Sequence, residues 1–143
     1  MPVRRTRFVK ASPEAAFALL RDFSRLPDYN PGVRMASVKP GPCRPGDTFT
    51  LRMGAGPARM RVRGEVLEVA DRSVRLRMRS VVDALETRFV EGAPGGCVVG
   101  WEVSYTVPIW LGGRLADALL FSPMAVRNID AELDGVRRIL EGS

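Results

Sequence analysis

The sequence predicts an α+β fold in which a curved antiparallel β-sheet wraps around one long C-terminal helix. Residues 122–140 carry apolar side chains at intervals of three and four, the spacing of an amphipathic helix. Before it, about six segments alternate apolar and polar residues, as half-buried antiparallel strands do. A twisted sheet with one apolar face needs a covering layer, and a helix of roughly 28 Å has the length to provide it.

The first elements are a strand and two short helices. Residues 3–9 alternate and predict the strand. Ser12 and Pro13 then have the residue types favoured at a helix N-cap and first position, which predicts a helix through residue 21. Ser24 is expected to begin a second short helical turn that ends at Leu26. The Pro- and Gly-rich residues 27–32 break the chain after it.

The central strands are predicted at residues 33–38, 48–53, 59–69, 74–78, 83–90 and 97–107, with Gly- and Pro-rich turns between several of them. Together with the first strand they make a sheet of about six to seven strands. In residues 83–90 the apolar parity predicts that Leu85 and Phe89 face the helix and that Glu86 and Arg88 face outward. Two arginine rows are also expected on the outer face, with glutamates that can pair with them: Arg59, Arg61, Arg63, Arg75, Arg77, Arg79, Glu65, Glu68, Glu86 and Glu102.

The long helix is expected to begin with Ser122 as its N-cap and Pro123 at its first position, and to end before Gly142. Its apolar stripe comprises Val126, Ile129, Leu133, Val136 and Leu140. Residues 108–113 predict a loop that carries Trp110. Residues 115–121 predict a first helical segment that is kinked or broken at Pro123.

Composition bounds the chemistry. The 143 residues predict a single domain, residues 1–143, and contain no histidine, which excludes catalysis or metal binding by imidazole. Cys43 and Cys97 have no metal-ligand spacing and are expected to be free thiols, although one disulfide between them stays possible. We expect no metal and no cofactor. The basic N-terminal stretch lacks the apolar core of a signal peptide, so a cytoplasmic location is expected.

Three stretches resemble the START / Bet v-type / polyketide-cyclase superfamily (SRPBCC), which has the helix-grip fold. They are residues 9–17 with the following Leu20-Arg21-Asp22, Leu26-Pro27 and Pro31-Gly32-Val33, the glycine turn Gly95–Trp101, and the closing segment Ala131–Glu141. Asp22, Phe23, Pro27 and Pro31 also resemble the opening of its coenzyme Q-binding subgroup. The resemblance implies a cavity between sheet and helix that binds lipids, sterols, quinones, polyketides or hormones, and in some members catalyses cyclisation or dehydration.

Given that fold, the inward parity predicts the lining of the cavity. The sheet would contribute Met53, Met60, Met78, Leu85, Trp101 and Tyr105, the mouth Tyr29 and Trp110, and the helix Met124, Asn128 and Ala131. Methionines and aromatic rings suit a flexible or planar apolar ligand, although the same residues can simply fill a core. Asp83, expected to face inward, and Tyr105 are the candidate acid–base groups.

Three functions follow as alternatives. The first is a protein that binds a hydrophobic small molecule (lipid, polyketide or quinone-like). The second is a polyketide cyclase or dehydratase that uses the same cavity. The third is a basic module for RNA or an acidic partner, since the net charge is +6 and the isoelectric point about 10.3. No DNA partner is expected, and the pattern is compatible with a monomer or a homodimer.

Overall fold

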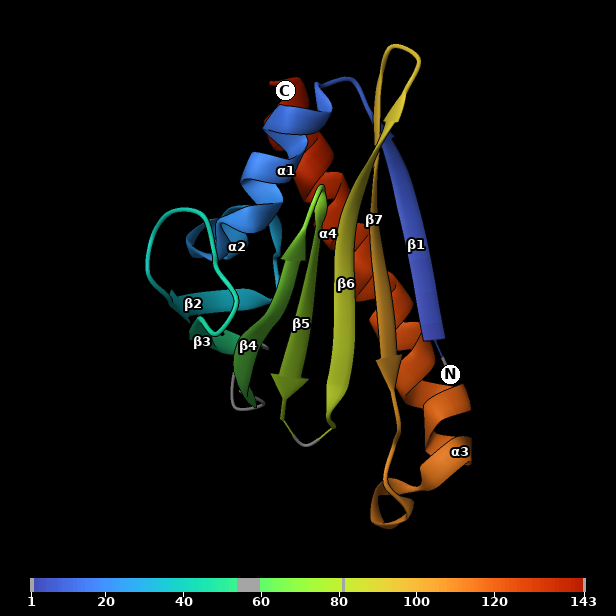
Figure 1. Cartoon of the computed structure of the whole chain (residues 1–143). Coiled ribbons are helices and arrows are strands. Elements are labelled where there is room, and N and C mark those ends of the chain that lie inside the picture. The colour runs from blue at the N-terminus through green and yellow to red at the C-terminus, as the bar shows by residue number, and fades with distance from the viewer. Residues whose placement is uncertain (1, 54–59, 81, 143) are drawn as a thin grey trace.

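The computed structural model describes residues 2–53, 60–80 and 82–142. Seven strands form one antiparallel sheet in the order β1-β7-β6-β5-β4-β3-β2 (Figure 1). Strands adjacent in the chain are therefore neighbours from β2 to β7, and β1 pairs with β7 at the far edge. The strands are β1 (Pro2–Val9), β2 (Val33–Ser37), β3 (Thr48–Met53), β4 (Met60–Ala70), β5 (Ser73–Arg79), β6 (Ala84–Ala93) and β7 (Gly96–Tyr105).

The helices lie on one side of this sheet (Figure 1). Short ones follow β1, another short series follows β7, and a long helix closes the chain. They are α1 (Pro13–Arg21), η1 (Phe23–Arg25), α2 (Leu26–Tyr29), η2 (Ile109–Leu111), α3 (Gly113–Ala116), the π-helical turn η3 (Asp117–Phe121) and α4 (Ser122–Glu141). The curled sheet around a long C-terminal helix, with short helices after the first strand, is the helix-grip architecture that the sequence predicts.

The first helix begins as expected. The Ser12 hydroxyl accepts a hydrogen bond from the Ala15 amide at 3.1 Å, and Pro13 occupies the first helical position. The start of α4 differs from the prediction, because Ser122 has helical dihedral angles and caps nothing. Helical structure already runs from Gly113, and the π-turn η3 precedes Pro123. Such a turn relaxes the hydrogen-bond ladder next to a proline, which explains how the chain stays helical through it.

The core fills the space between the sheet and the helices. From the sheet, Val66, Leu76 and Val99 are buried, and from α4 Leu133 and Val136 are buried. Two helices pack closely where glycine permits it: a Cβ on Gly135 of α4 would overlap the backbone of Tyr29 in α2. α4 lies against β1 and β7 and against α1 and α2.

Two arginines of β1 fix α4 along that edge of the sheet. Arg5 makes a two-pronged contact with Asp130, with distances of 2.9 and 3.0 Å. Arg7 Nε lies 3.2 Å from Oδ1 of Asp134, which is one helical turn after Asp130 on α4. The charged side of the final helix therefore faces the edge strand at these points, and the pairs set the register between α4 and β1.

Candidate functional site

A cluster of charged and polar side chains is buried where β6, β7, α2 and α4 meet. Its centre is Arg88, whose guanidinium donates through Nε to Glu86 at 3.2 Å and through Nη1 to the Tyr29 hydroxyl at 3.1 Å. Nη2 lies 3.3 Å from Glu132 Oε2, and that same oxygen accepts a 3.1 Å hydrogen bond from the Trp101 indole. We refer to these five residues as the Arg88 cluster.

Strand register brings the members of the Arg88 cluster together. Arg88 is paired directly with Trp101 on β7 and with Val74 on β5, so it lies in an inward-facing row of the sheet. Its guanidinium lies 4.7 Å from the Trp101 ring and 5.6 Å from the Phe23 ring, which are cation–π distances. Glu132 comes from α4 on the opposite side. The sheet and the final helix each contribute one carboxylate to a single arginine.

The Arg88 cluster is out of balance electrostatically when both carboxylates are ionised, because one cation then faces two anions. Arg88 is 2% exposed, Glu86 6% and Glu132 3%, so solvent does not screen the excess charge. Burial raises the pKa of Glu132 to about 7, with Glu86 acting in the same direction and Arg88 and Trp101 opposing it. A carboxyl group with that pKa can give or take a proton near neutral pH.

Arg88 and Tyr29 keep their protons in this environment. Burial lowers the pKa of Arg88, but its two carboxylate neighbours outweigh this and raise the value above its ordinary one. Burial likewise raises the pKa of Tyr29. The guanidinium and the phenol are therefore constant hydrogen-bond donors, of the kind that can stabilise negative charge on a ligand oxygen.

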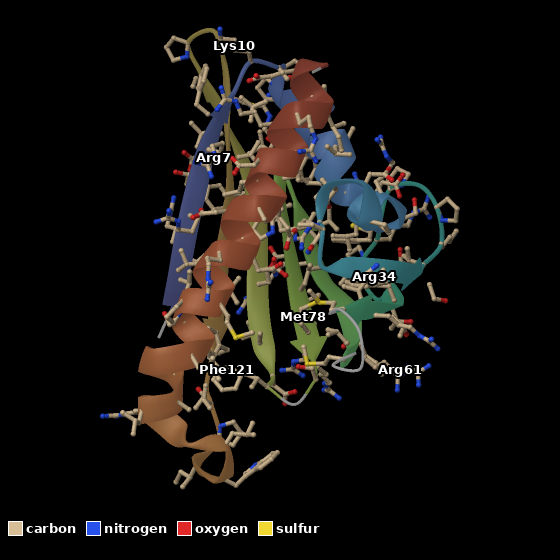
Figure 2. All side chains as sticks on the ribbon, turned by 180° about the vertical axis from the view of Figure 1, so that it is seen from behind. Arg7, Lys10, Arg34, Arg61, Met78 and Phe121 are labelled. Atoms are coloured by element: carbon tan, nitrogen blue, oxygen red, sulfur yellow. The ribbon has the colours of Figure 1, made fainter. Side chains whose placement is uncertain are left out.

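Below the Arg88 cluster, the concave face of the sheet carries apolar side chains that are incompletely covered. Met78 is paired with Ala84, and Ala84 with Tyr105, so these three form one inward row across β5, β6 and β7. Met53 and Met60 are paired further along the sheet; Met78 and Met53 are half-buried and Met60 is 40% exposed. Met78 lies on the face of the sheet that carries α4 (Figure 2).

Tyr105 at the end of this row has a fixed hydroxyl. It donates a hydrogen bond of 2.7 Å to Asp117 in the π-turn η3. Burial and this hydrogen bond raise the pKa of Tyr105 to about 12, so the phenol stays protonated at neutral pH. The contact ties the end of β7 to the segment that precedes α4.

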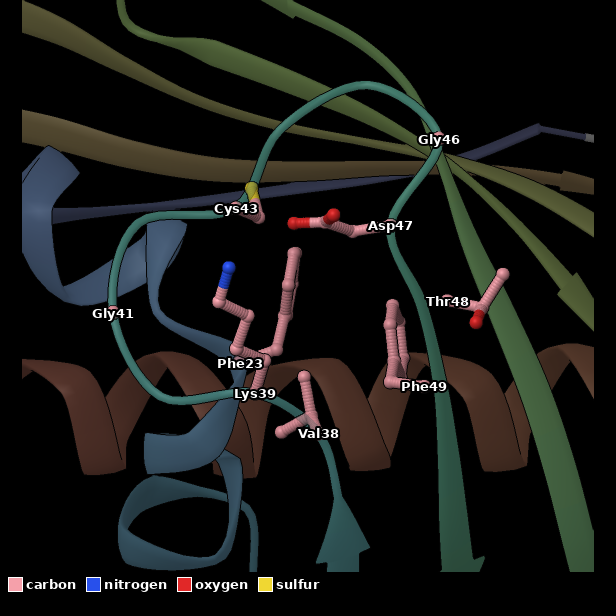
Figure 3. A pocket seen from close by; sticks show the side chains of 9 residues that line it. All are labelled: Phe23, Val38, Lys39, Gly41, Cys43, Gly46, Asp47, Thr48 and Phe49. Carbon is pink, nitrogen blue, oxygen red and sulfur yellow. The ribbon is translucent and has the colours of Figure 1, made fainter.

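A pocket of about 290 Å³ lies under the segment between β2 and β3 (Figure 3). Phe23 and Phe49 stack at its wall with ring centroids 4.8 Å apart. The Phe23 ring is also the one beside Arg88, so a single aromatic side chain contacts both the pocket and the Arg88 cluster. The full lining is Phe23, Val38, Lys39, Gly41, Cys43, Gly46, Asp47, Thr48 and Phe49.

Comparison with known proteins agrees with this architecture. A family model described as "Polyketide cyclase / dehydrase and lipid transport" matches residues 2–141. The chain belongs to this polyketide cyclase / dehydrase and lipid transport family. No curated protein matches it.

Solved structures resemble the chain over nearly its whole length. The protein TTHA0849 from Thermus thermophilus has a TM-score of 0.79 and 23% identity, over 100% of this chain and 99% of that one. The di-domain ARO/CYC StfQ from the steffimycin biosynthetic pathway has a TM-score of 0.82 and 13% identity, over 99% of this chain and 50% of StfQ. Major latex-like protein 151 from Panax ginseng has a TM-score of 0.76 and 10% identity, over 98% and 97% of the two chains.

The structure corrects the predicted parity of β6 in this family member. Glu86, Arg88 and Val90 are the buried, inward side chains, whereas Leu85 belongs to the outer face, where it is paired with Ser104. Asp83 precedes the strand and is exposed, so its expected inward placement is also wrong. The outward apolar residue Phe89 is covered locally: its ring lies over Gly100 and 4.8 Å from the Arg4 guanidinium.

Other predicted lining residues are distributed between core and surface. Tyr29 is 1% exposed, in the Arg88 cluster and not at a mouth, while Trp110 is 75% exposed. Trp101 is fully buried as expected. On α4, Met124 is half-exposed, and Asn128 and Ala131 are half-buried. The Asn128 amide oxygen lies 3.6 Å from where a Gly32 Cβ would be, so it faces the turn after α2.

Sequence reasoning did not identify Glu86, Arg88 and Glu132 as site residues. The usable signal was their spacing: Glu132 is one residue from the buried stripe position Leu133, and Glu86 and Arg88 are two apart and therefore share one face of a strand. A glutamate next to an apolar stripe and two opposite charges on one strand face are compatible with a buried ion pair.

The structure also bears on metals, thiols and membranes. Among the described residues, no group of three or more Cys, Asp or Glu side chains has the arrangement of a metal site. Cys43 and Cys97 are buried free thiols, and burial raises the pKa of both. No helix in the described part of the chain is long and apolar enough to cross a membrane.

The arginine rows lie on the outer face, with one correction. Glu65 is paired with Arg77 and Glu68 with Arg75, as cross-strand neighbours should be, but Glu86 lies inside. Arg59 lies outside the described residues. On neighbouring strands, two pairs of arginines lie directly opposite each other: Arg52 on β3 with Arg61 on β4, and Arg63 on β4 with Arg79 on β5.

Proposed function

We propose that the chain binds a hydrophobic small molecule between the concave face of the sheet and α4, with an oxygen of the ligand directed at the Arg88 cluster. The observation that carries this proposal is the burial of one arginine and two glutamates in an otherwise apolar core. Removing such charges from water costs several kcal/mol per ion, and an apolar replacement of similar volume is often as stable or more so. A functional role gives a reason for charges at that position.

The chemistry of the Arg88 cluster indicates the class of ligand. Arg88 is a fixed donor, and the Tyr29 hydroxyl, which accepts from Arg88, keeps its own proton to donate, so the pair suits a carbonyl, enolate or carboxylate oxygen. The inward row of Met78, Ala84 and Tyr105, together with Met53 and Met60, suits an apolar body of variable shape. Lipids, polyketides and quinone-like molecules combine these two features. The family description, which includes lipid transport, is compatible with this ligand class.

A triple variant separates function from stability. Arg88→Met, Glu86→Leu and Glu132→Leu together replace the three charges by apolar side chains. We expect unfolding in urea to require at least as much denaturant as for the wild type, and we expect ligand binding to be lost. Binding is measured by native mass spectrometry of the purified protein with organic extraction, and by fluorescence of anilinonaphthalene sulfonate (ANS). A folded triple variant that retains the same extracted molecule and the same ANS affinity would refute the proposal.

A second candidate function is catalysis of cyclisation or dehydration. It is favoured by Glu132, a buried carboxyl group with a pKa of about 7 that lies beside a fixed guanidinium. The carboxyl group could move a proton to or from a carbon next to a carbonyl while Arg88 holds the oxygen. In this role Glu132 replaces Asp83, which is exposed, and Tyr105, whose hydroxyl is bonded to Asp117.

Turnover of a poly-β-ketone thioester tests the second function. The rate in the wild type should follow the ionisation of a group near pH 7, and Glu132→Gln should abolish that dependence together with most of the rate. Asp83→Asn serves as a control at an exposed carboxylate and should leave the rate unchanged. Ligand binding without any turnover would leave the chain a binding protein.

A further inference from the structure

One end of the molecule exposes a cluster of large apolar side chains that no described residue covers. The segment between β7 and α4 forms the projecting tip at the lower end of Figure 1. Ile109 and Trp110 in η2 are 93% and 75% exposed, and more than half of each of Leu115 and Leu120 is exposed. Met124, near the start of α4, is 50% exposed. We call this set the apolar tip.

Positive charge lies toward the same end of the molecule as the apolar tip. Arg114 is exposed within α3 itself. The ends of β3, β4 and β5 carry the opposed pairs Arg52 with Arg61 and Arg63 with Arg79, and all four side chains are exposed. No ion pair within 4.0 Å is found for these four in the described part of the chain. Arg61 and Phe121, just before α4, lie toward the same end of the molecule (Figure 2).

Like charges placed directly opposite on neighbouring strands destabilise a sheet unless an anionic partner neutralises them. An exposed tryptophan with neighbouring aliphatic side chains is typical of a surface that enters the boundary between headgroups and acyl chains. A bilayer with anionic lipids provides both the negative charge for the arginines and the apolar boundary for the exposed side chains. A second copy of the chain is a poor partner by comparison, because it brings the same positive charge to the same place.

We propose that the apolar tip docks on an anionic lipid bilayer, with Ile109 and Trp110 inserted at the headgroup boundary and with Arg114 and the arginines at the ends of β3, β4 and β5 against lipid phosphates. The incompletely covered residues Met53, Met60 and Met78 lie toward the same end of the sheet, since they are at or near the ends of β3, β4 and β5. Docking there would bring the concave face next to the acyl chains. This inference does not depend on the Arg88 cluster or on which ligand the interior holds.

The test is co-sedimentation of the full chain with vesicles of phosphatidylcholine, with and without phosphatidylglycerol. We expect binding to the anionic vesicles that weakens with salt, and much weaker binding to the neutral ones. Ile109→Ser with Trp110→Ser should reduce binding at least about tenfold, since both side chains would leave the acyl boundary. Arg61→Glu with Arg79→Glu should reduce it similarly, because each basic residue near an anionic surface contributes about fivefold.

Matched controls distinguish the tip from the rest of the surface. Leu67→Ser alters an exposed apolar residue in the middle of β4, and Arg44→Glu with Arg138→Glu reverses two exposed charges away from the tip; both variants should bind vesicles like the wild type. Tryptophan emission should shift to the blue on binding, and Trp110→Phe should abolish the shift, because Trp101 is already buried. Glu132→Gln should leave vesicle binding intact even if it changes the interior ligand.

Four results would overturn the proposal. The first is an absence of binding to anionic vesicles, and the second is equal binding of the Ile109→Ser/Trp110→Ser variant. The third is tighter binding to single-stranded RNA at the same salt concentration, insensitive to the apolar substitutions, which would assign the arginines to nucleic acid. The fourth is a dimer in light scattering that the same double variant dissociates, since a second copy would then cover the tip.

Discussion

Glu132 is a residue whose protonation links folding to pH. In an unfolded chain its carboxyl group ionises near pH 4.5, whereas in the folded protein burial raises the pKa to about 7. Between these values the unfolded state releases a proton that the folded state retains. Rising pH therefore favours the unfolded state through this group, and the effect is complete once the pH exceeds about 7.

We predict that Glu132→Gln removes this pH dependence. From pH 5 to pH 8 the wild type should lose about 2–3 kcal/mol of unfolding free energy through Glu132, and the glutamine variant should not. The measurement is urea unfolding of both proteins at several pH values, analysed as the difference between them so that other titrating groups cancel. A constant difference across this range would contradict the raised pKa. Asp83→Asn is the exposed control.

The Arg88 cluster also shows where the hydrophobicity of a single residue predicts its burial and where it does not. Hydrophobicity correctly predicted Trp101 as buried, but it assigned Arg88 and Glu86 to solvent because each is charged when considered alone. Their burial depends on partners from other elements: Tyr29 in α2, Trp101 in β7 and Glu132 in α4. No local pattern encodes a contact between residues up to 59 positions apart.

Among the elements, β6 shows how a partner strand decides which face is inward. Its apolar residues Leu85 and Phe89 predicted the wrong face. Phe89 is accommodated outside because its neighbour on β7 is Gly100, which leaves room for the ring, and because Arg4 of β1 lies over it. Strands such as β5, where apolar and basic residues alternate strictly, were predicted with the correct face. Alternation predicts the inward face correctly only where one face of the strand carries apolar side chains and the other carries polar ones that remain in solvent.

Helix boundaries were predicted well where a cap is local and less well where tertiary structure intervenes. Ser12 and Pro13 begin α1 as the sequence indicates. The similar pair Ser122-Pro123 lies inside a longer helical run, because the π-turn η3 accommodates the proline and Tyr105 holds Asp117 in place. The long helix, the number of strands and their order along the chain were nonetheless accessible from periodicity alone.

The packing of α2 on α4 leads to a prediction at this scale. Gly135→Ala should destabilise the protein, because the added methyl group would overlap the carbonyl group of Tyr29 and push the two helices apart. Overpacking of this kind costs about 1–3 kcal/mol, which exceeds the roughly 1 kcal/mol that alanine gains over glycine in a helix. Thermal unfolding measures the change.

Gly92→Ala is the matched control for that substitution. Gly92 lies in β6, and a Cβ there would meet only side-chain atoms at ordinary contact distances of 3.8 and 3.9 Å. Its unfolding temperature should stay close to that of the wild type. Displacement of Tyr29 should also weaken the Arg88 cluster, so Gly135→Ala is expected to bind ANS differently from the wild type. If Gly135→Ala unfolds at the same temperature as Gly92→Ala, the close approach of the two helices is not a constraint.

The candidate functional features of the molecule are arranged in order along its length. The Arg88 cluster lies in the interior, and the apolar tip projects from one end (Figure 1). The incompletely covered inward residues Met53, Met60 and Met78 are at or near the ends of β3, β4 and β5 that lie toward the tip. α4 covers the side of the sheet formed by β1 and β7, whereas η1 and α2 approach β2. A ligand that moved between a bilayer and the Arg88 cluster would therefore meet apolar side chains along its path.

The last prediction tests this path at Met78. Met78→Trp adds volume on the concave face at a half-buried position. We expect the variant to fold with a similar unfolding temperature but to lose ANS affinity about tenfold or more and to release no extractable ligand, because the indole would obstruct the proposed ligand position between the concave face and α4. Leu67→Trp, which adds a similar volume at an exposed position of β4, should bind like the wild type. Unchanged binding by a folded Met78→Trp protein would place the ligand elsewhere, and the pocket beside Phe23 would then be the next position to fill.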